Sequence, residues 1–412
     1  MAKENRSVKN FPNLRFPGFD GQWEDKKLGD VATFIKGKGI SKNEIDENGK
    51  TECIRYGELY TYYEEVISEI KSKTNTDISS LVLSEANDVI IPASGETQIA
   101  IATASCVLKS GVALGGDLNI IKTKNNGVFL SYYLNSKKKL EIAKLSQGIS
   151  VVHLYSSQLA LLNLKLPQLD EQNKLADFLS HLNSRIQTQK KIIEGLSLQK
   201  ISIVKKLFEN KIKFKTDSKT HNWERKKLAE ISEEHLHKNP NNKYNEVFSV
   251  AKHKGVINQI EHLGRSFSAK EILHYKLVYP GDLVYTKSPT SDFPFGIIKQ
   301  NRTGRIGVVS PLYCVFTPKT YALGYLLHEY FNSAVNTFNY LNPLVQKGAK
   351  NTMNINNETF LNGASILLPM DEGEQEKIYK FLLTLDEKIK LENELLTQYE
   401  NQKKYLLQNL FV

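Results

Sequence analysis

The sequence repeats itself once, and this duplication constrains the fold more than any other feature. Residues 166–208 match residues 368–411, and from position 171 onward the match needs no gap at an offset of 203. A second pair of matching segments opens each half at an offset of 200, WEDKKL at 23–28 and WERKKL at 223–228. A chain of 412 residues is long enough for two or three domains. We therefore expect two copies of one unit, each a globular body followed by a helix.

Each repeated segment predicts one long helix. Apolar side chains recur three and four positions apart over about 40 residues without a proline, which is the seam of a coiled coil. Such a helix is a rod of roughly 60 Å. The expected seam consists of Leu175, Leu182, Ile186, Ile193 and Leu207 in the first helix and of Ile378, Leu385, Ile389, Leu396 and Leu410 in the second.

Polar residues interrupt both seams. They are Gln189 and Lys200 in the first helix and Glu392 and Lys403 in the second. A buried polar seam residue often fixes the register of a helix pair or its choice of partner. Alternatively, these residues lie at a solvated edge of the pairing, and the sequence leaves both interpretations open.

The two bodies alternate short β-rich runs with turn signals, and each contains one helical stretch, near 128–146 and near 321–341. This pattern predicts an α+β fold for each body. We expect the first body at 1–165 and the second at 213–367, with the long helices at 166–212 and 368–412.

Charge and cysteine usage narrow the class of protein. The chain has 55 Lys and Arg against 45 Asp and Glu, a net charge of +10. This excess favours a polyanionic partner, because cations at phosphates release condensed counterions. Cys53, Cys106 and Cys314 have neither disulfide-framework nor metal-ligand spacing, which indicates free thiols in a reducing compartment. With no signal peptide and no apolar run of roughly 18–20 residues, we expect a cytoplasmic protein without a membrane span.

Motifs for catalysis are absent from the sequence. An adenine methyltransferase needs a Pro-Pro corner for the flipped base, and the chain has no Pro-Pro dipeptide. The glycine-rich run Leu114-Gly115-Gly116-Asp117 lies between short strands and reads as a hairpin turn. Gly49-Lys50-Thr51 ends like a phosphate-binding loop, but Glu44 stands where that motif needs glycine.

A nuclease centre of the Asp…Glu-x-Lys type has two partial matches, Asp88 with Glu96 and Asp282 with Lys287, and neither has the full spacing. The sequence therefore predicts a chain without catalysis, bound metal or cofactor of its own.

Recognition chemistry remains. Loops carrying Lys, Arg, Asn, Gln and Ser between strands can donate to phosphates and base edges. The stretches after Gly148 and Gly348 are the strongest candidates, because they occupy equivalent places while differing in content. Any single candidate has the alternative of being a plain solvated loop residue. The candidate DNA-binding residues are Lys36, Lys38, Arg55, Tyr56, Ser94, Glu96, Thr97, Gln147 and His153 in the first body, and Lys252, His253, Lys254, Lys287, Ser288, Thr290, Lys347, Lys350, Asn351 and Asn354 in the second.

These features resemble one family. The pattern Leu-Pro-x-x-x-Glu-Gln, then a heptad helix ending in Leu-Phe, occurs at 166–208 and again, with one extra residue before Glu374, at 368–411. Together with the opening FPNLRFPGFDGQWEDKKLGDVA at 11–32, it resembles the specificity subunits of type I restriction–modification systems. The likeness covers the whole chain and is specific in the helices and the openings, but loose in the bodies.

The resemblance implies two target-recognition domains held apart by two antiparallel helices, so that the internal repeat forms a pseudo-two-fold. It also implies double-stranded DNA as a partner, with each domain reading half of a bipartite site. Two modification subunits that methylate adenine, and restriction subunits that translocate and cleave DNA, are the implied protein partners. S-adenosylmethionine, ATP and Mg²⁺ are then expected on those partners.

Two other function classes were kept open. One is a fused restriction–methylation enzyme, which the missing motifs disfavour. The other is a coiled-coil assembly protein with basic lobes that does not bind DNA. Methyl-donor binding by the isolated chain would identify the first, and a gel shift with a modification subunit present would separate the second from DNA recognition.

Overall fold

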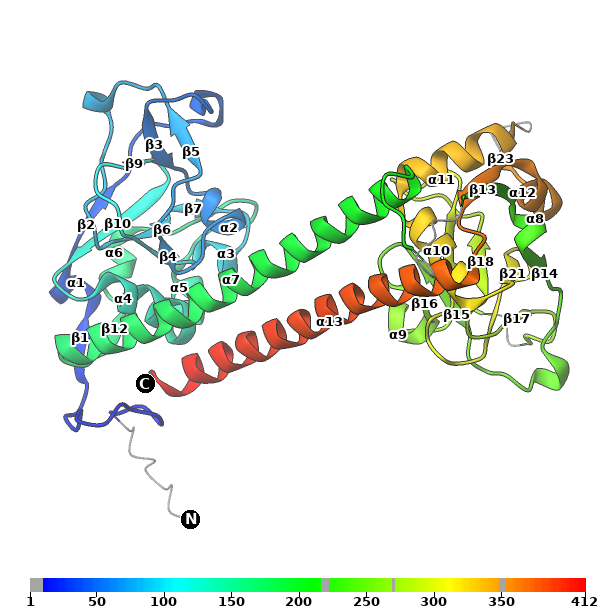
Figure 1. The fold of residues 1–412 in the computed structure, drawn as a ribbon. Coiled ribbons are helices and arrows are strands. Elements are labelled where there is room, and N and C mark those ends of the chain that lie inside the picture. The colour runs from blue at the N-terminus through cyan, green and yellow to red at the C-terminus, as the bar shows by residue number, and fades with distance from the viewer. Residues whose placement is uncertain (1–9, 216–221, 269–270, 348–352) are drawn as a thin grey trace, which may run out of the picture. The chain divides into compact units, whose positions relative to one another are not determined.

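A computed structural model describes residues 10–215, 222–268, 271–347 and 353–412 (Figure 1). The chain divides into two compact units: unit 1 is 1–191 with 393–412, and unit 2 is 192–392. Both boundaries fall inside long helices, α7 (Leu169–Phe208) and α13 (Glu372–Asn409). Each unit therefore contains one α+β body and a part of each long helix, which confirms the predicted fold class.

The body of unit 1 has a five-stranded sheet in the order β2-β10-β6-β8-β4. The pairs are antiparallel except for β4 with β8. All five residues of β6 are buried, as expected for a central strand. A three-stranded sheet β5-β3-β9 and the pairs β1-β12 and β7-β11 complete it. The strands are β1 Glu24–Lys27, β2 Ala32–Lys36, β3 Thr51–Ile54, β4 Val66–Ile67, β5 Ser72–Thr74, β6 Asp88–Pro92, β7 Ser94–Gly95, β8 Ser105–Val107, β9 Ala113–Leu114, β10 Leu118–Thr123, β11 Val152–His153 and β12 Asn163–Leu166.

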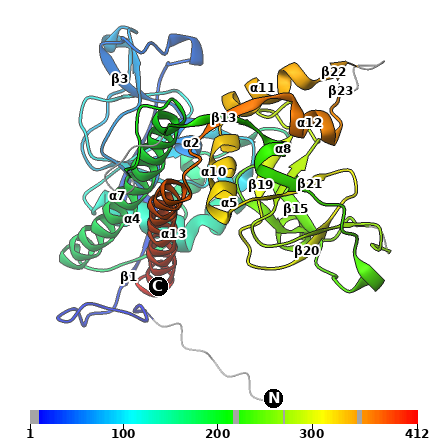
Figure 2. The same cartoon turned by 45° about the vertical axis from the view of Figure 1, so that its right-hand side comes forward.

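Short helices connect these strands, and α4 packs its buried aromatic face against the first turns of α7 (Figure 2). The helix expected near 128–146 is present, but a π-helical turn, η3 (Leu134–Lys138), interrupts it. The helices of the unit 1 body are α1 Leu28–Val31, α2 Glu58–Thr61, α3 Gln98–Ile101, α4 Gly127–Tyr133, α5 Lys139–Leu145 and α6 Ser156–Leu159, with 3-10 turns η1 Lys42–Glu44 and η2 Ile78–Ser80.

Unit 2 has a four-stranded sheet, β14-β21-β18-β19, which repeats the order β2-β10-β6-β8 of unit 1. Its other sheets are strand pairs, β13-β24, β15-β16, β17-β20 and β22-β23. The strands are β13 Glu224–Lys227, β14 Ser232–Glu234, β15 Phe248–Ala251, β16 Gly255–Asn258, β17 Lys276–Val278, β18 Leu283–Thr286, β19 Ile297–Gln300, β20 Gly307–Val309, β21 Cys314–Pro318, β22 Gln346–Lys347, β23 Met353–Asn354 and β24 Ser365–Leu368.

The helical stretch expected near 321–341 is two helices, α10 (Tyr321–Asn332) and α11 (Ala334–Leu341). The break comes at Ser333, whose side chain accepts a hydrogen bond from the Asn336 N–H and so caps α11. The remaining helices are α8 Leu228–Ile231, α9 Gln259–Leu263 and α12 Asn357–Gly363, with 3-10 turns η4 Pro240–Asn242 and η5 Asn342–Leu344.

One expected turn is wrong. The glycine pair at 115–116 was predicted to close a hairpin, but the strands on either side of it do not pair. Strand β9 pairs with β3, whereas β10 lies in the five-stranded sheet. The glycines instead allow the chain to pass closely between two sheets, because a Cβ on Gly115 would lie 3.2 Å from the Ile54 carbonyl oxygen.

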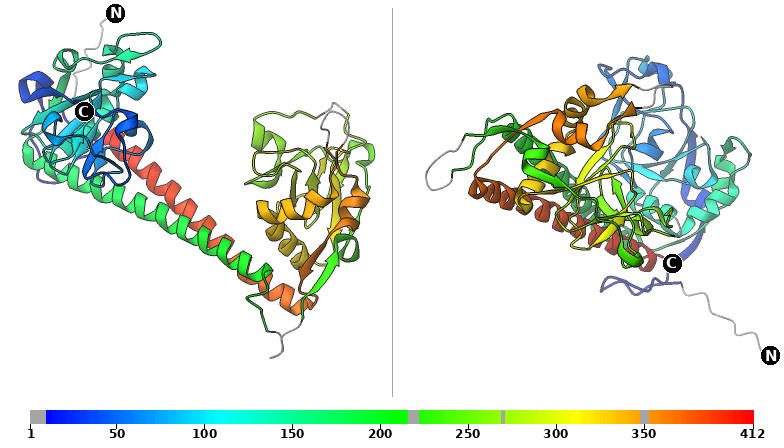
Figure 3. Two further views of the ribbon diagram at one scale, coloured as in Figure 1. Left: turned by 90° about the horizontal axis from the view of Figure 1, so that it is seen from above. Right: turned by 90° about the vertical axis from the view of Figure 1, so that its right-hand side faces the viewer.

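The long helices run antiparallel within each unit (Figure 3). In unit 1 the Lys403 ammonium donates to Asn183 at 2.9 Å, and Lys190 lies 3.6 Å from Glu400. In unit 2 Lys200 pairs with Asp386 at 2.5 Å. Every expected seam residue is buried or half-buried: Leu175, Leu182, Ile186, Leu207, Ile378 and Leu410 are buried, and Ile193, Leu385, Ile389 and Leu396 are half-buried.

Three of the four polar seam residues lie inside the packing and not at a solvated edge, and the fourth, Glu392, is half-buried. Gln189 is 5% exposed, and the side chains of Lys200 and Lys403 are 13% and 16% exposed. Lys403 also pairs with Glu65 at 2.9 Å, and Lys200 with Glu329 at 3.1 Å. Paired charges in a helix seam fix register, since a slip would leave them unpaired. Within the described residues, no helix has the length and apolarity to cross a bilayer.

Candidate DNA interface

The same buried anchor positions the body on the long helices in both units. The Trp23 indole N–H donates to Glu171 at 3.4 Å, and the Trp223 indole N–H donates to Glu374 at 3.1 Å. Both tryptophans come from the matched openings, and both glutamates from the first turn of a long helix. In unit 1 Arg15 adds two hydrogen bonds to Glu171, at 2.8 and 2.6 Å. Neither glutamate was among the predicted site residues, although both are repeated at an offset of 203.

The strand pairs next to the anchors are also equivalent. Strand β1 pairs with β12 through Glu24 and Leu166, and β13 pairs with β24 through Glu224 and Leu368. Each Leu-Pro run is then followed within three residues by a long helix, which begins at Leu169 in α7 and at Glu372 in α13. The anchors, these strand pairs and the starts of the long helices form a frame that is the same in both halves. The loops of each body are attached to this frame.

Two aspartates that were weighed as nuclease residues belong to this frame. The Asp88 carboxylate accepts the Glu85 backbone N–H at 2.8 Å and pairs with Lys122 at 3.1 Å. Asp282 holds the equivalent place, where it accepts the Tyr279 backbone N–H at 2.7 Å and further hydrogen bonds from a threonine and a histidine. Both carboxylates are almost fully buried and occupied by donors, so they stabilise the start of a central strand.

In unit 1 the structure brings three of the candidate segments together. Ser94 in β7 pairs with His153 in β11, and His153 exchanges two backbone hydrogen bonds with Gln147, at 2.9 and 2.7 Å. The Tyr60 hydroxyl donates to the Ser94 carbonyl at 2.9 Å, and the Tyr60 ring contacts the exposed Tyr56. Residues far apart in sequence thereby form one continuous surface.

Lys36 and Lys38 extend this surface. Lys36 pairs across the sheet with Asn119, whose amide donates to the Leu154 carbonyl beside the hairpin at 2.9 Å. The Lys38 backbone N–H donates to the carbonyl of Leu114 at 2.9 Å, next to the turn that also contacts Ile54. Both ammonium groups belong to exposed residues. They are free to approach phosphates, since no described residue forms an ion pair with them.

Not every unit 1 candidate is available for DNA. Ser94 is 7% exposed, so its contribution is structural in this state. Arg55 lies near Glu58, and its Nε is buried with no hydrogen-bond partner among the described residues. Thr97 is exposed but caps α3 by accepting the Ala100 N–H at 3.2 Å. Glu96 is exposed.

In unit 2 the structure brings two of the candidate segments together. Lys252, His253 and Lys254 make the turn between β15 and β16, and the Lys252 ammonium pairs with Asp292 in the loop after β18. That loop also carries Lys287, Ser288 and Thr290; the last two are exposed. Burial lowers the pKa of Lys287. The loop is equivalent to the Ser94–Thr97 segment, because each follows the matching strand, β18 or β6.

The hairpin after Gly348 is described only in part. Gln346 pairs with Asn354, and Lys347 pairs with Met353. The spacing of Lys347 and Met353 is the same as that of Gln147 and His153. Lys350 and Asn351 lie outside the described residues.

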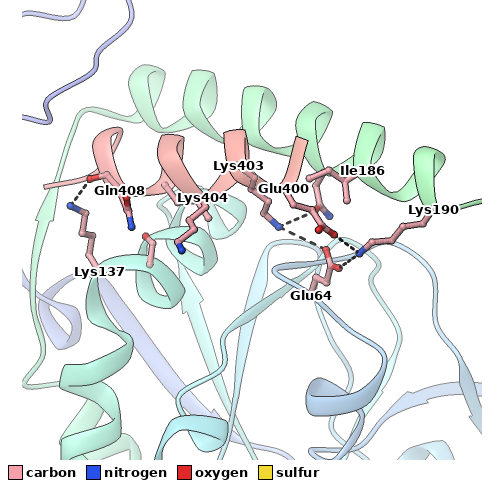
Figure 4. Close-up of a pocket in the computed structure, with 11 residues that line it drawn as sticks. Glu64, Lys137, Ile186, Lys190, Glu400, Lys403, Lys404 and Gln408 are labelled. Atoms are coloured by element: carbon pink, nitrogen blue, oxygen red, sulfur yellow. Dashed lines mark hydrogen bonds and ion pairs between the residues drawn. The ribbon is translucent and has the colours of Figure 1, made fainter. Parts of the chain in front are cut away.

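A cavity of about 410 Å³ lies between the helix pair of unit 1 and the loop that carries Glu64 (Figure 4). Glu64 lies 3.8 Å from Lys190 and 3.9 Å from Lys403, and Lys190 also faces Glu400. Lys137 donates to a carbonyl of α13 at 3.0 Å, and burial lowers its pKa. Four lysines against two glutamates make this lining basic, so it favours an acidic contact.

No group of three or more potential metal ligands occurs among the described residues. All three cysteines are buried and unpaired, and burial raises the pKa of the Cys53 thiol to about 11 and that of Cys106 and Cys314 to about 12. Such thiols stay protonated at neutral pH and are poor nucleophiles and ligands.

Comparisons with known proteins agree with this architecture. Residues 21–198 match the family model of the type I restriction modification DNA specificity domain. The type I restriction enzyme MjaVIII specificity subunit of Methanocaldococcus jannaschii is 26% identical over 243 residues, 55% of this chain and 52% of that protein. The chain thus spans about half the length of this curated relative.

Two solved structures share the fold. The S subunit of the type I restriction-modification system from M. genitalium matches with a TM-score of 0.60 at 14% identity, covering 98% of this chain and 99% of that one. A structure concerned with complex assembly and conformational transition of the type I R-M system matches with a TM-score of 0.51 at 15% identity, over 97% and 99%. These likenesses are of fold. The family match over residues 21–198, with this fold, agrees with the resemblance of the repeated helices and openings to the specificity subunits of type I restriction–modification systems.

Proposed function

We propose that this chain is the DNA-reading subunit of a type I restriction–modification complex, in which each body reads one half of a bipartite, asymmetric site. The observation that carries the proposal is the equivalence of the two frames. The Trp–Glu anchors, the strand orders and the hairpin spacing coincide, while the loops that they carry differ in content, with Glu96 against Thr290 and Gln147 against Lys347. A constant frame with different loops is what reading two unlike words requires.

The charges of the candidate loops support DNA as the ligand. Lys36 and Lys38 in unit 1, and His253 and Lys254 in unit 2, are exposed on loops or strand ends. Cations at such positions bind phosphates and fix the protein on the duplex. Exposed Gln147, Ser288 and Thr290 then supply neutral donors and acceptors for base edges.

Catalysis in this proposal belongs to partner subunits. Two modification subunits with S-adenosylmethionine would methylate adenine, and restriction subunits with ATP and Mg²⁺ would cleave. The helix pair and the basic cavity beside Glu64 are the surface we assign to protein partners. The chain itself supplies recognition and spacing, which separates it from a fused restriction–methylation enzyme.

A body exchange tests the proposal. Residues 219–367 are replaced by the matching segment of a related subunit, and methylated sites are mapped in cells that also express the modification subunit. We expect one word of the site to change, while the other word and the spacer stay the same. Exchange of the helix segment alone is the matched control and should leave both words unchanged.

Three results would contradict the proposal. A continuous or palindromic site, or a change in both words, would mean that the bodies are not independent readers. Methyl transfer by the purified chain alone would favour the enzyme. Complex formation without any sequence-selective DNA binding would favour a coiled-coil assembly protein.

A further inference from the structure

The hairpin at 147–153 in unit 1 is fixed at its base. Gln147 and His153 close it with two backbone hydrogen bonds, and β11 pairs with β7 on its outer side. Val152 and Leu154 are 3% and 1% exposed, so they fasten this strand to the core. The Leu154 N–H also donates to the Ala93 carbonyl at 3.0 Å. The tip therefore projects from a rigid support.

Glycine is required where the tip turns. Gly148 has φ of +123°, and a Cβ there would lie 2.1 Å from the Val151 carbonyl oxygen. A side chain at this position would open the turn. The conformation that presents the next residue is thus built into the backbone.

The next residue is Ile149, and its side chain is 99% exposed. Val151 and Tyr155 on the same segment are 53% and 54% exposed, and Ile99 on neighbouring α3 is 49% exposed. Scattered apolar residues on a surface are ordinary, but a fully exposed isoleucine held out by a fixed hairpin with other apolar groups around it indicates a contact surface. No described residue of unit 1 covers it.

The side chains around the tip indicate which kind of partner fits this surface. His153 and Gln147 at its base are exposed and polar, and Lys36 lies across the sheet from Asn119, which hydrogen-bonds beside the hairpin. A two-stranded ribbon fits the major groove of B-DNA, where the only apolar group on a base edge is the 5-methyl of thymine. Binding to a membrane or a protein would not require Gln147, His153 and Lys36 around the apolar tip.

We infer that Ile149 reads thymine by contact with its 5-methyl group in the half-site of unit 1. This rests on the proposed function and adds a specificity-determining residue to it. Gln147 and His153 flank the contact and hold the hairpin in the groove. Ile149 would discriminate between bases by shape and apolar contact, because its side chain forms no hydrogen bond.

The test uses the full chain with its modification subunit, and duplexes of the mapped site. Each thymine of the unit 1 half-site is replaced in turn by deoxyuridine, which removes only the methyl group. We expect one replacement to weaken binding about 4-fold, the affinity that burial of one methyl group supplies. With Ile149→Ala the thymine duplex should bind about equally weakly, and the same replacement should have no further effect. Leu312→Ala, which alters a 76% exposed leucine in unit 2, is the matched control and should keep the full thymine dependence.

Several outcomes overturn the inference. They are tolerance of every deoxyuridine by the unaltered chain, a thymine dependence that survives Ile149→Ala, and a half-site without thymine on either strand. Weakening of all duplexes equally by Ile149→Ala would mean a non-specific wedge. Absence of any sequence-selective binding would instead be a failure of the proposed function, and body exchange detects it independently.

Discussion

Unit 1 and unit 2 use the same tryptophan–glutamate anchor but reinforce it differently. Around Trp23 lie the rings of Phe129, Tyr133 and Phe411, with centroids 5.9 to 6.4 Å away. Around Trp223 only the Phe208 ring is in contact among described residues, at 6.3 Å. The duplicated positions thus keep the hydrogen bond, while the apolar packing has diverged. The two halves share the hydrogen bond between tryptophan and glutamate more closely than the packing around it.

The seam charges have diverged in the same way. Lys403 and Lys200 are equivalent at an offset of 203, and so are their partners Asn183 and Asp386. Unit 1 pairs its lysine with a neutral amide and Glu65. In unit 2 Asp386 also accepts from the Tyr325 hydroxyl and lies 3.5 Å from Arg302. At this seam position the two helices are therefore joined by an ion pair in unit 2 and by a lysine–amide hydrogen bond in unit 1.

The largest expected effect separates the two aromatic anchors. Phe411 is 2% exposed and its counterpart Phe208 is half-buried. Phe411→Ala should lower the free energy of unfolding of unit 1 by about 3–5 kcal/mol, because it leaves a cavity in the core. Phe208→Ala should lower the free energy of unfolding of unit 2 by a smaller amount, because Phe208 is only half-buried.

The chain's two tryptophans, one per unit, make this measurable. Urea unfolding is followed by fluorescence, with Trp223→Phe isolating unit 1 and Trp23→Phe isolating unit 2. Equal losses in the two units would show that the different packing of the anchors has no energetic consequence.

The next effect concerns Lys299, which is 3% exposed where unit 1 has Ser105. Burial, with the nearby cations Arg302 and Lys200, lowers the pKa of Lys299 to about 8. Below pH 8 the folded state holds a charge that the unfolded state accommodates freely. Stability of unit 2 should therefore rise between pH 8 and the ordinary lysine pKa of 10.5, as the folded group loses its proton first.

Lys299→Met should raise the stability of unit 2 at pH 7 by up to about 3 kcal/mol and remove that slope. Urea unfolding at pH 7.0 and at about pH 9.5 checks both. Unit 1, followed through Trp23, serves as the internal control. An unchanged slope in the variant would assign the pH dependence to another group.

The smallest effect exchanges the seam partners. Asp386→Asn gives unit 2 the amide of unit 1 and leaves Lys200 and Arg302 with one anion fewer. We expect a loss of about 1–2 kcal/mol in the unfolding free energy of unit 2, which added salt should reduce. Asn183→Asp should change unit 1 by about 0.5 kcal/mol or less, because Lys403 already has Glu65 as its partner. If the two exchanges had equal effects, charge would not distinguish the seams.

The sequence was a good guide to what repeats. Matching at offsets of 200 and 203 predicted two bodies and two long helices, and the structure has them. The pairing of Trp23 with Glu171 was not foreseen, since a contact across 148 positions leaves no local pattern. Repetition of both partners was the available signal.

Loops were predicted less well, for physical reasons. Gly148 marked a turn, but an isoleucine beside it reads as a core residue, and only the fixed hairpin shows that Ile149 points outward. The break at Ser333 was hidden because the apolar period continues through it. The turn at 115–116 was misread because tertiary pairing, which local sequence does not encode, assigns β9 and β10 to different sheets.

Unit 1 is built from two distant segments of the chain, and this has a consequence for its folding during synthesis. Its core includes Leu410 and Phe411, packed with Trp23, yet these residues leave the ribosome long after residue 191. At roughly 5–20 residues per second, the nascent N-terminal body waits on the order of 10–40 s for the segment that closes its core. During that interval an aromatic surface around Trp23 stays open. Chaperone binding to ribosome-held chains that still lack Leu410 and Phe411 outside the ribosome should therefore exceed binding to the released chain.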